Sequence, residues 1–196
     1  MSLSSGVIAI TLSAPSRRVE AMWPLVLKAL EEVGADNFNT QCAAAATINI
    51  ECPTWSPVKE RHAAKDKQPK LWALQERYWP SGFFGRGLIQ LTWLDNYRAA
   101  GLALGLDLVG HPELALDPWI SARIFAWYFV THNVAEAAKE GKWTLARMRV
   151  NGGNGVDVLD GGTTHGLNKF LAAVGALTAS NTQPAQPLAQ PVGETQ

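Results

Sequence analysis

The sequence has no excess of either charge and no long apolar run. Its 17 Lys and Arg residues balance 17 Asp and Glu residues over 196 positions, so no global field would attract a polyanion. Nucleic acid is therefore not an expected partner. Because no stretch of eighteen or more apolar residues occurs, a membrane span is excluded on length. We expect no stable membrane association.

Cysteines and metal-ligand motifs are also scarce. The two cysteines, Cys42 and Cys52, lie on a segment with helical character, which would place them roughly 15 Å apart. A disulfide needs Cα atoms within about 7 Å, so two buried free thiols are expected. The four histidines are dispersed, and no CxxC pair or HExxH helix occurs. We therefore expect neither a metal nor another cofactor.

The length suits one compact domain with a single core. The apolar run 7–12 has no basic residue before it, which makes a poor secretory signal. We assign residues 1–18 to an N-terminal extension and residues 19–179 to the domain. Residues 180–196, rich in Pro and Gln and without a periodic apolar face, predict a disordered tail.

Apolar spacing and helix-boundary residues predict a mainly α fold. Asp117 is a good N-cap and Pro118 suits the first helical position, and the segment that follows is apolar almost all round, as in a central buried helix. Frequent Pro and Gly between 54 and 87 predict irregular loops, with at most a small hairpin within 54–90. The predicted helices span residues 20–33, 39–51, 95–101, 117–131, 144–149 and 164–177.

Two glutamates near flexible backbone suit glycosidic bond cleavage, which uses a protonated carboxyl and normally an ionised one. Glu51 ends an otherwise uncharged helix beside Ile50 and Cys52, where desolvation would raise the pKa of a carboxyl and keep it protonated. From position alone, a solvated carboxylate at a helix end is the alternative. Glu60 lies in the polar segment PVKERH, whose cations favour an ionised carboxylate, although a plain surface residue would fit too.

Two other acids compete with Glu60 for the second role. Glu76, in LQERYW, and Asp66 lie in the same irregular stretch. Both rank below Glu60, and the choice between Glu60 and Glu76 stays open at this point. Arg86, between two glycines, is expected to brace a neighbouring acid or the fold.

Three ordered blocks carry a resemblance to a known family. They are FFGRGLIQLTWLDNYRAAG (83–101), GHPELALDPWISARIFAWYF (110–129) and VNGGNG (150–155). Together they closely resemble glycoside hydrolase family 19, which comprises chitinases and phage endolysins. The resemblance spans about residues 23–177 and implies a lysozyme-like helical domain with a substrate cleft.

The resemblance also implies roles for single residues. Glu51 matches the family's general acid, Glu60 resembles the acid of the following loop, and Thr92 matches a hydroxyl residue that helps to hold the attacking water. The positions that match cleft-lining residues are Gln90, Asn96, Tyr97 and Asn151. Amides and hydroxyls suit sugar recognition, and aromatic faces cover the C–H side of a sugar ring. Core packing is an equally good role for Tyr97.

The implied reaction is inverting hydrolysis of a β-1,4-linked amino-sugar polymer, with the carboxyl groups roughly 6.5–9.5 Å apart. We expect peptidoglycan as the substrate, cut by an endolysin-like enzyme that stays in the host cytoplasm until it is released to the cell wall. Chitin is the alternative substrate. A non-catalytic lysozyme-like phage or wall-binding module is the alternative class. A monomer is expected, because a polymer cleft must stay open.

Overall fold

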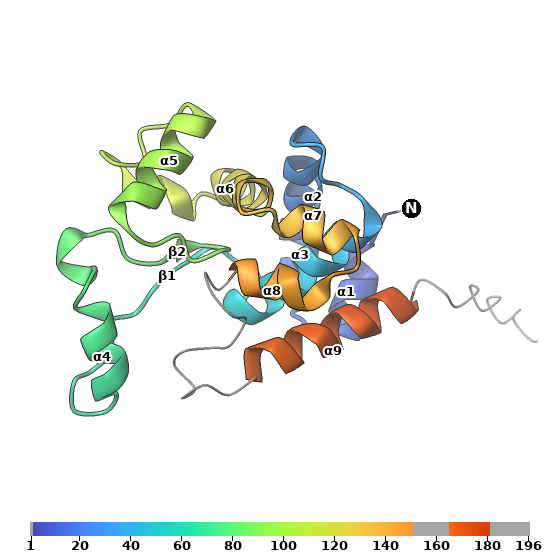
Figure 1. Cartoon of the computed structure of the whole chain (residues 1–196), viewed down its shortest axis with the longest axis horizontal. Coiled ribbons are helices and arrows are strands. Elements are labelled where there is room, and N and C mark those ends of the chain that lie inside the picture. Colours follow the sequence, from blue (N-terminus) through green and yellow to red (C-terminus); the bar gives the residue numbers. More distant parts are fainter. Residues whose placement is uncertain (1, 151–164, 181–196) are drawn as a thin grey trace, which may run out of the picture.

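The computed structural model describes residues 2–150 and 165–180 and shows a mainly helical protein (Figure 1). Two short 3-10 helices, η1 (Trp79–Ser81) and η2 (Pro112–Leu116), supplement the α-helices. The α-helices are α1 (Ser5–Thr11), α2 (Ser16–Glu32), α3 (Phe38–Glu51), α4 (Pro69–Gln75), α5 (Leu94–Leu104), α6 (Pro118–Thr131), α7 (Val134–Lys139), α8 (Trp143–Val150) and α9 (His165–Ser180). The mainly α fold class is confirmed.

Within the described residues, β-structure is limited to one antiparallel pair. Strand β1 (Val58–Lys59) pairs with β2 (Arg86–Gly87), with Val58 opposite Gly87 and Lys59 opposite Arg86. The pair lies within 54–90, where at most a small hairpin was expected, but no tight turn joins its strands. The chain between its strands carries α4 and η1 and forms a lobe at one end of the molecule (Figure 1).

Helix α3 forms the centre of the core. The Asn37 side chain accepts a hydrogen bond from Thr40 N and caps the start of α3, and Pro53 follows just past its end, where it cannot continue a helix. Every residue from Thr40 to Ile48 is buried, and α7, α8 and α9 pack against this helix. Its four consecutive alanines, residues 43–46, let these neighbours approach closely. The helix thereby fixes the position of Glu51 in its last turn.

Helix α6 has the predicted boundaries. The Asp117 side chain accepts hydrogen bonds from the backbone N–H groups of Trp119 and Ile120, Pro118 occupies the first turn, and the helix ends at Thr131. Its buried face packs against α2 and α5. A local cap with a proline behind it is thus sufficient to locate this helix from sequence.

Three α-helices, α1, α4 and α7, were not expected from sequence; α4 lies in the stretch 54–87 that was expected to be irregular. Residues 1–18 were assigned to an extension, whereas the structure adds α1 there, with Leu3 and Ile8 buried in the same core as the domain. Helix α1 packs against α2 and α9. Helix α7 is short and lies between the predicted helices 117–131 and 144–149. The tail assigned to residues 180–196 lies beyond the described residues, apart from Ser180.

Both cysteines are free and buried, as expected. Cys42 lies within α3 with no exposed surface, and burial raises the pKa of its thiol to about 12. The thiolate is the reactive form of cysteine, so Cys42 is chemically inert in the folded protein.

Gly87 is predicted to be indispensable for packing β2 against η2 and α6. Its φ is +81°, and an added Cβ would lie 2.7 Å from Ser121 Oγ and 2.8 Å from the Ala115 carbonyl oxygen. Gly87→Ala should therefore lower the free energy of unfolding by about 3 kcal/mol or more, as measured by urea unfolding.

Gly105→Ala is the matched control, because Gly105 has φ +67° with no atom within 4 Å of an added Cβ. It should cost only the backbone strain, about 1–2 kcal/mol. If both variants lost the same free energy of unfolding, the atoms around Gly87 would be able to shift without a loss of stability.

Candidate active site

Glu51 ends α3 and is held by an arginine from a distant helix. Arg147 Nη1, on α8, donates a hydrogen bond of 2.6 Å to Glu51 Oε1. The Arg147 side chain is 1% exposed and the Glu51 side chain 25%, so the ion pair is buried from the arginine side and open from the carboxyl side. The pKa of the Tyr128 phenol, on α6, is raised. Burial is the largest cause, and the nearby charge of Glu51 adds to it.

This contact corrects one expectation from the sequence. The surroundings of Glu51 were expected to be uncharged, because its own helix carries no other ionisable side chain except Cys42. In the structure, Arg147, 96 positions later in the chain, contacts Glu51. No local sequence pattern predicts that contact. The ion pair involves the ionised carboxylate, which is the form that a general acid adopts once it has delivered its proton.

Glu60 directly follows β1 and accepts three hydrogen bonds. Tyr78 Oη donates to Oε1 at 2.7 Å, and Gln75 Nε2 donates to the same oxygen at 2.8 Å. The backbone N–H of Gly85 donates to Oε2 at 2.8 Å, while Glu60 N donates to the Gly85 carbonyl oxygen at 2.8 Å. Glu60 therefore connects β1, the α4 lobe and the start of β2.

Gly85 allows Gln90 to lie beside this carboxylate. A Cβ at position 85 would lie 2.8 Å from Gln90 Oε1 and 3.1 Å from Glu60 Oε2, so both side chains approach the Gly85 Cα. Gln90 Nε2 donates to the carbonyl oxygens of Val58 and Gly87, which fixes the amide across the β1–β2 pair. The Oε1 atom of Gln90 thus faces the same space as Glu60 Oε2.

Thr92 and Asn96 continue this arrangement. Thr92 Oγ1 donates to the Gln90 carbonyl oxygen at 2.9 Å, and Asn96 Nδ2 donates to the Thr92 carbonyl oxygen at 2.8 Å. Both side chains are only partly buried. With its proton committed to the backbone, the Thr92 hydroxyl oxygen keeps lone pairs for accepting a hydrogen bond. The structure therefore links Glu60, Gln90, Thr92 and Asn96 into one contiguous set.

Tyr97, the fifth residue expected near this set, lies in the core instead of lining a cleft. It has no exposed surface, its hydroxyl donates to the Phe84 carbonyl oxygen at 2.9 Å, and Arg86 Nη1 donates to that hydroxyl at 3.0 Å. Arg86 also donates a hydrogen bond to the Gly82 carbonyl oxygen. None of its hydrogen bonds in the described residues goes to a carboxylate. Of the two roles considered for each, the structure supports core packing for Tyr97 and fold bracing for Arg86.

The rival acids are more exposed than Glu60. Glu76 Oε1 is 2.9 Å from His62 Nε2, and both side chains are more than 30% exposed. Asp66 is exposed in the loop before α4. Glu60, by contrast, is fixed by three donors, so the geometry favours Glu60 as the second carboxylate.

Asn151, which the resemblance places in the cleft, lies outside the residues that the structure describes. Over residues 2–150 and 165–180, no group of three or more His, Cys, Asp or Glu side chains is placed to hold a metal ion. No helix in these ranges is long and apolar enough to cross a membrane.

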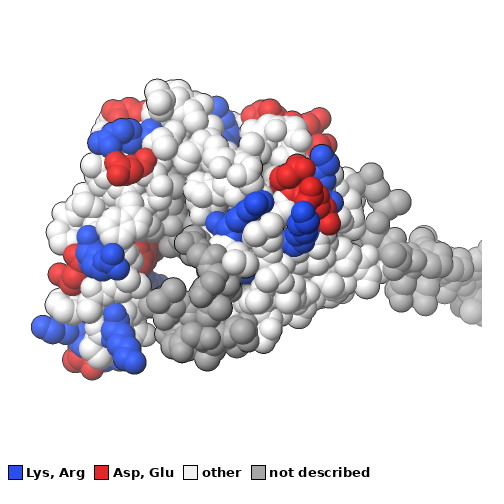
Figure 2. Space-filling view, in the orientation of Figure 1, with Lys and Arg blue, Asp and Glu red and all other residues white. Residues whose placement is uncertain are grey.

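The face of the molecule drawn in Figure 2 is hollowed. Figure 2 shows a depression between the lobe on the left, which carries α4, and the helical body on the right. Acidic and basic side chains are interspersed on this face rather than forming a field of one sign. A neutral polymer would thus meet no long-range repulsion here.

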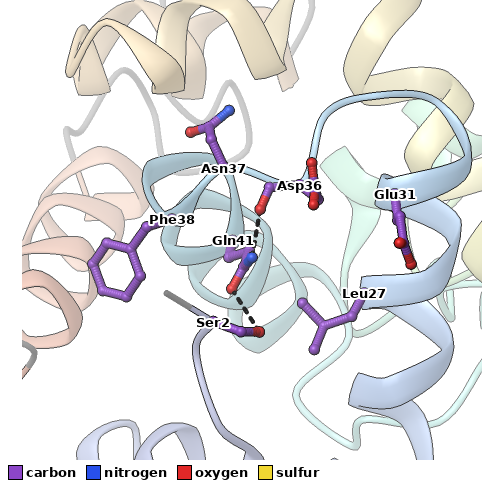
Figure 3. A pocket seen from close by; sticks show the side chains of 7 residues that line it. All are labelled: Ser2, Leu27, Glu31, Asp36, Asn37, Phe38 and Gln41. Carbon is purple, nitrogen blue, oxygen red and sulfur yellow. Dashed lines mark hydrogen bonds between the residues drawn. The ribbon is translucent and has the colours of Figure 1, made fainter.

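A second hollow, of about 630 Å³, lies elsewhere, between α2 and the start of α3 (Figure 3). Gln41 lies at its base, accepts from Leu3 N and donates to the Asp36 carbonyl oxygen. The buried amide therefore ties the N-terminal segment to the α2–α3 turn. Neither candidate catalytic carboxylate lines this pocket, whose residues are Ser2, Leu27, Glu31, Asp36, Asn37, Phe38 and Gln41.

The chain is a mainly helical protein, and comparison with protein families identifies its class. The family model described as "Chitinase class I" matches residues 40–154. The chain therefore belongs to glycoside hydrolase family 19. The matched segment contains Glu51, Glu60, Gln90, Thr92 and Asn96.

Individual relatives agree with this assignment. Chitinase 8 of Oryza sativa subsp. japonica is 38% identical over 103 residues, which cover 47% of this chain and 40% of the relative. Endochitinase At2g43590 of Arabidopsis thaliana is 41% identical over 78 residues, covering 37% of this chain and 29% of the relative. The chain thus spans less than half the length of these curated relatives.

Solved structures share the fold. A bacterial family 19 chitinase superposes with a TM-score of 0.63 at 21% identity, covering 89% of this chain and 94% of the other. Chitinase C from Streptomyces griseus HUT6037 gives a TM-score of 0.62 at 20% identity, covering 90% and 76% respectively. At such identities the likeness concerns the fold.

The Glu51–Arg147 contact predicts different stabilities for two substitutions at Glu51. Glu51→Gln keeps an oxygen that can accept from Arg147, whereas Glu51→Ala removes this acceptor from a guanidinium that is 1% exposed. Glu51→Ala should therefore lower the free energy of unfolding by about 1–3 kcal/mol more than Glu51→Gln, as measured by urea unfolding.

Glu76→Ala serves as the control, because the Glu76 carboxylate is more than one third exposed. Its effect should stay within about 0.5 kcal/mol. If Glu51→Ala and Glu51→Gln were equally stable, the contact would not contribute to stability.

Proposed function

We propose that this protein hydrolyses β-1,4 bonds in a polymer of N-acetylglucosamine, as in chitin, with Glu51 as general acid and Glu60 as general base. The observation that carries the proposal is the contrast between the two carboxyl groups. Glu51 is one quarter exposed at the end of a rigid helix. Glu60 is fixed as an acceptor by three donors beside Gln90 and Thr92. In the proposal, Glu51 delivers a proton to the substrate and Glu60 receives one from the attacking water.

The chemistry follows from these placements. The Glu51 proton goes to the glycosidic oxygen as the bond to the anomeric carbon breaks, and Arg147 stabilises the carboxylate that results. A water molecule attacks the anomeric carbon from the opposite face while it gives a proton to Glu60. Its second hydrogen can be accepted by Thr92 Oγ1, whose own proton is engaged by the Gln90 carbonyl oxygen. Attack by water from the opposite face inverts the anomeric configuration.

Chitin is preferred as the substrate because the relatives described above are named as chitinases. From the sequence alone peptidoglycan was the expected substrate, and none of the relatives described above supports that order. Peptidoglycan has the same β-1,4 amino-sugar backbone, so contacts with the sugar rings alone would accept both polymers. It is retained as the second substrate to test, together with the release to the cell wall that it would require.

The catalytic proposal predicts a large loss of activity in Glu51→Gln. A general acid contributes on the order of 10²–10⁴-fold to the rate, and Gln cannot donate a carboxyl proton. The value of kcat/KM for chitin oligosaccharides should fall by that factor, whereas Glu76→Gln should stay within about twofold. Proton NMR at early times should show α-anomeric ends released by the unmodified protein.

The substrate is decided by comparing colloidal chitin with purified peptidoglycan and identifying the released ends by mass spectrometry. New reducing N-acetylglucosamine ends from chitin would support the proposal. Release of muropeptides with reducing N-acetylmuramic acid ends, with no cleavage of chitin, would replace chitin by peptidoglycan. Binding of either polymer without any cleavage would overturn the enzymatic proposal in favour of a non-catalytic module.

A further inference from the structure

The two oxygens of Glu60 differ in how many acceptor positions remain. An ionised carboxylate offers about two positions on each oxygen. On Oε1, both are used, by Tyr78 Oη at 2.7 Å and Gln75 Nε2 at 2.8 Å. On Oε2, only the Gly85 N–H occupies a position, at 2.8 Å. One acceptor position is left, and it belongs to Oε2.

The remaining position lies on the side of the reaction's other groups. Gly85 is the residue at which Glu60 Oε2 and Gln90 Oε1 come together, and Thr92 follows two residues after Gln90 with its hydroxyl bonded to the Gln90 carbonyl oxygen. Oxygen Oε1 instead faces Tyr78 and Gln75 in the α4 lobe. The α4 lobe thus occupies one oxygen and leaves the other beside Gln90, two residues before Thr92.

We infer that Tyr78 and Gln75 are positioning residues, which occupy Oε1 of Glu60 and leave Oε2 as the oxygen that receives the proton from the attacking water. In that step a water O–H bond breaks, its proton passes to Oε2, and the water oxygen forms the new bond to the anomeric carbon. The glycosidic C–O bond breaks, and its oxygen takes the proton of Glu51. The inference rests on the proposed function, in which Glu60 is the base.

Both positioning side chains are themselves fixed. Gln75 is 1% exposed, accepts from Ala63 N at 2.6 Å and donates to the Arg61 carbonyl oxygen at 2.9 Å, so its amide cannot turn without losing these bonds. Tyr78 is 8% exposed. Burial, and then the hydrogen bond and charge of Glu60, raise the pKa of Tyr78, so its phenol keeps its proton at every working pH. Neither donor switches off as pH changes.

Other ionisable groups around Glu60 are engaged elsewhere. Arg86 bonds the Tyr97 hydroxyl and two carbonyl oxygens, and His62 bonds Glu76. Burial is the largest cause of the raised pKa of Tyr97, to which the charge of Glu60 adds. Lys59 Nζ lies over the Phe84 ring, 4.9 Å from its centroid. The direct donors to the carboxylate are therefore Tyr78, Gln75 and Gly85 N.

Removing the Tyr78 hydroxyl should shift the acid limb of the pH profile. The base works only when ionised, and donors stabilise the ionised form. With one donor fewer, protonation occurs at higher pH. In Tyr78→Phe the acid limb of the kcat profile for chitin oligosaccharides should move up by about one pH unit, and kcat on that limb should fall about tenfold while KM changes less than about twofold.

Gln75→Glu provides a second variant that does not depend on Tyr78. It keeps an oxygen for Ala63 N and nearly the same shape, but it replaces the donor to Oε1 with an acceptor, so the acid limb should move further than in Tyr78→Phe. Tyr97→Phe is the matched control, because it removes another buried tyrosine hydroxyl that bonds Phe84 and Arg86 rather than Glu60. Its acid limb should not move, and thermal unfolding of all three variants measures any loss of stability.

The outcomes separate this inference from the proposed function. If Tyr78→Phe and Gln75→Glu lose stability but keep the acid limb of the unmodified protein, the hydrogen bonds to Oε1 only hold the fold and the inference is wrong. If the unmodified protein cleaves neither polymer, the proposed function fails. The carboxyl ¹³C titration of Glu60, assigned with Glu60→Gln, then decides the positioning claim. A midpoint at higher pH in Tyr78→Phe supports it, and an unchanged midpoint overturns it.

Discussion

The hydrogen bonds of Glu60 are the constraint on which the candidate active site depends. They join the end of β1, the α4 lobe and the start of β2 at one carboxylate. This junction adds to the short strand pair at the point where the chain between residues 60 and 85 returns to the sheet. A charge with three donors is a strong local anchor, so the same group serves both the architecture of the lobe and the proposed chemistry.

The other carboxyl group is positioned by different means. Glu51 lies in the last turn of α3, whose residues from Thr40 to Ile48 are all buried. The hydrogen bond from Arg147 on α8 sets the orientation of the Glu51 carboxylate. One acid is thus fixed by a rigid helix and a cation, and the other by a loop and neutral donors. The two supports are largely independent, which allows substitutions to perturb one carboxyl group without displacing the other.

Sequence patterns predicted what is decided locally. Asp117 and Pro118 gave the start of α6, and Pro and Gly between 54 and 87 indicated the irregular lobe with its small strand pair. The contacts that sequence reasoning missed join distant segments. Arg147 reaches Glu51 across 96 positions, and Tyr78 and Gln75 reach Glu60 from within the lobe. Tyr97 shows the same limit, because its burial depends on how α5 packs and no spacing rule encodes it.

Because Cys42 is buried, the reactivity of its thiol reports local unfolding of the core around α3. The thiol has no exposed surface and lies within the helix that carries Glu51. An alkylating reagent can modify it only in molecules where α3 has separated from its neighbours, since the folded form offers neither access nor thiolate. The rate of Cys42 alkylation therefore measures how often the support beneath Glu51 comes apart, without any label being introduced.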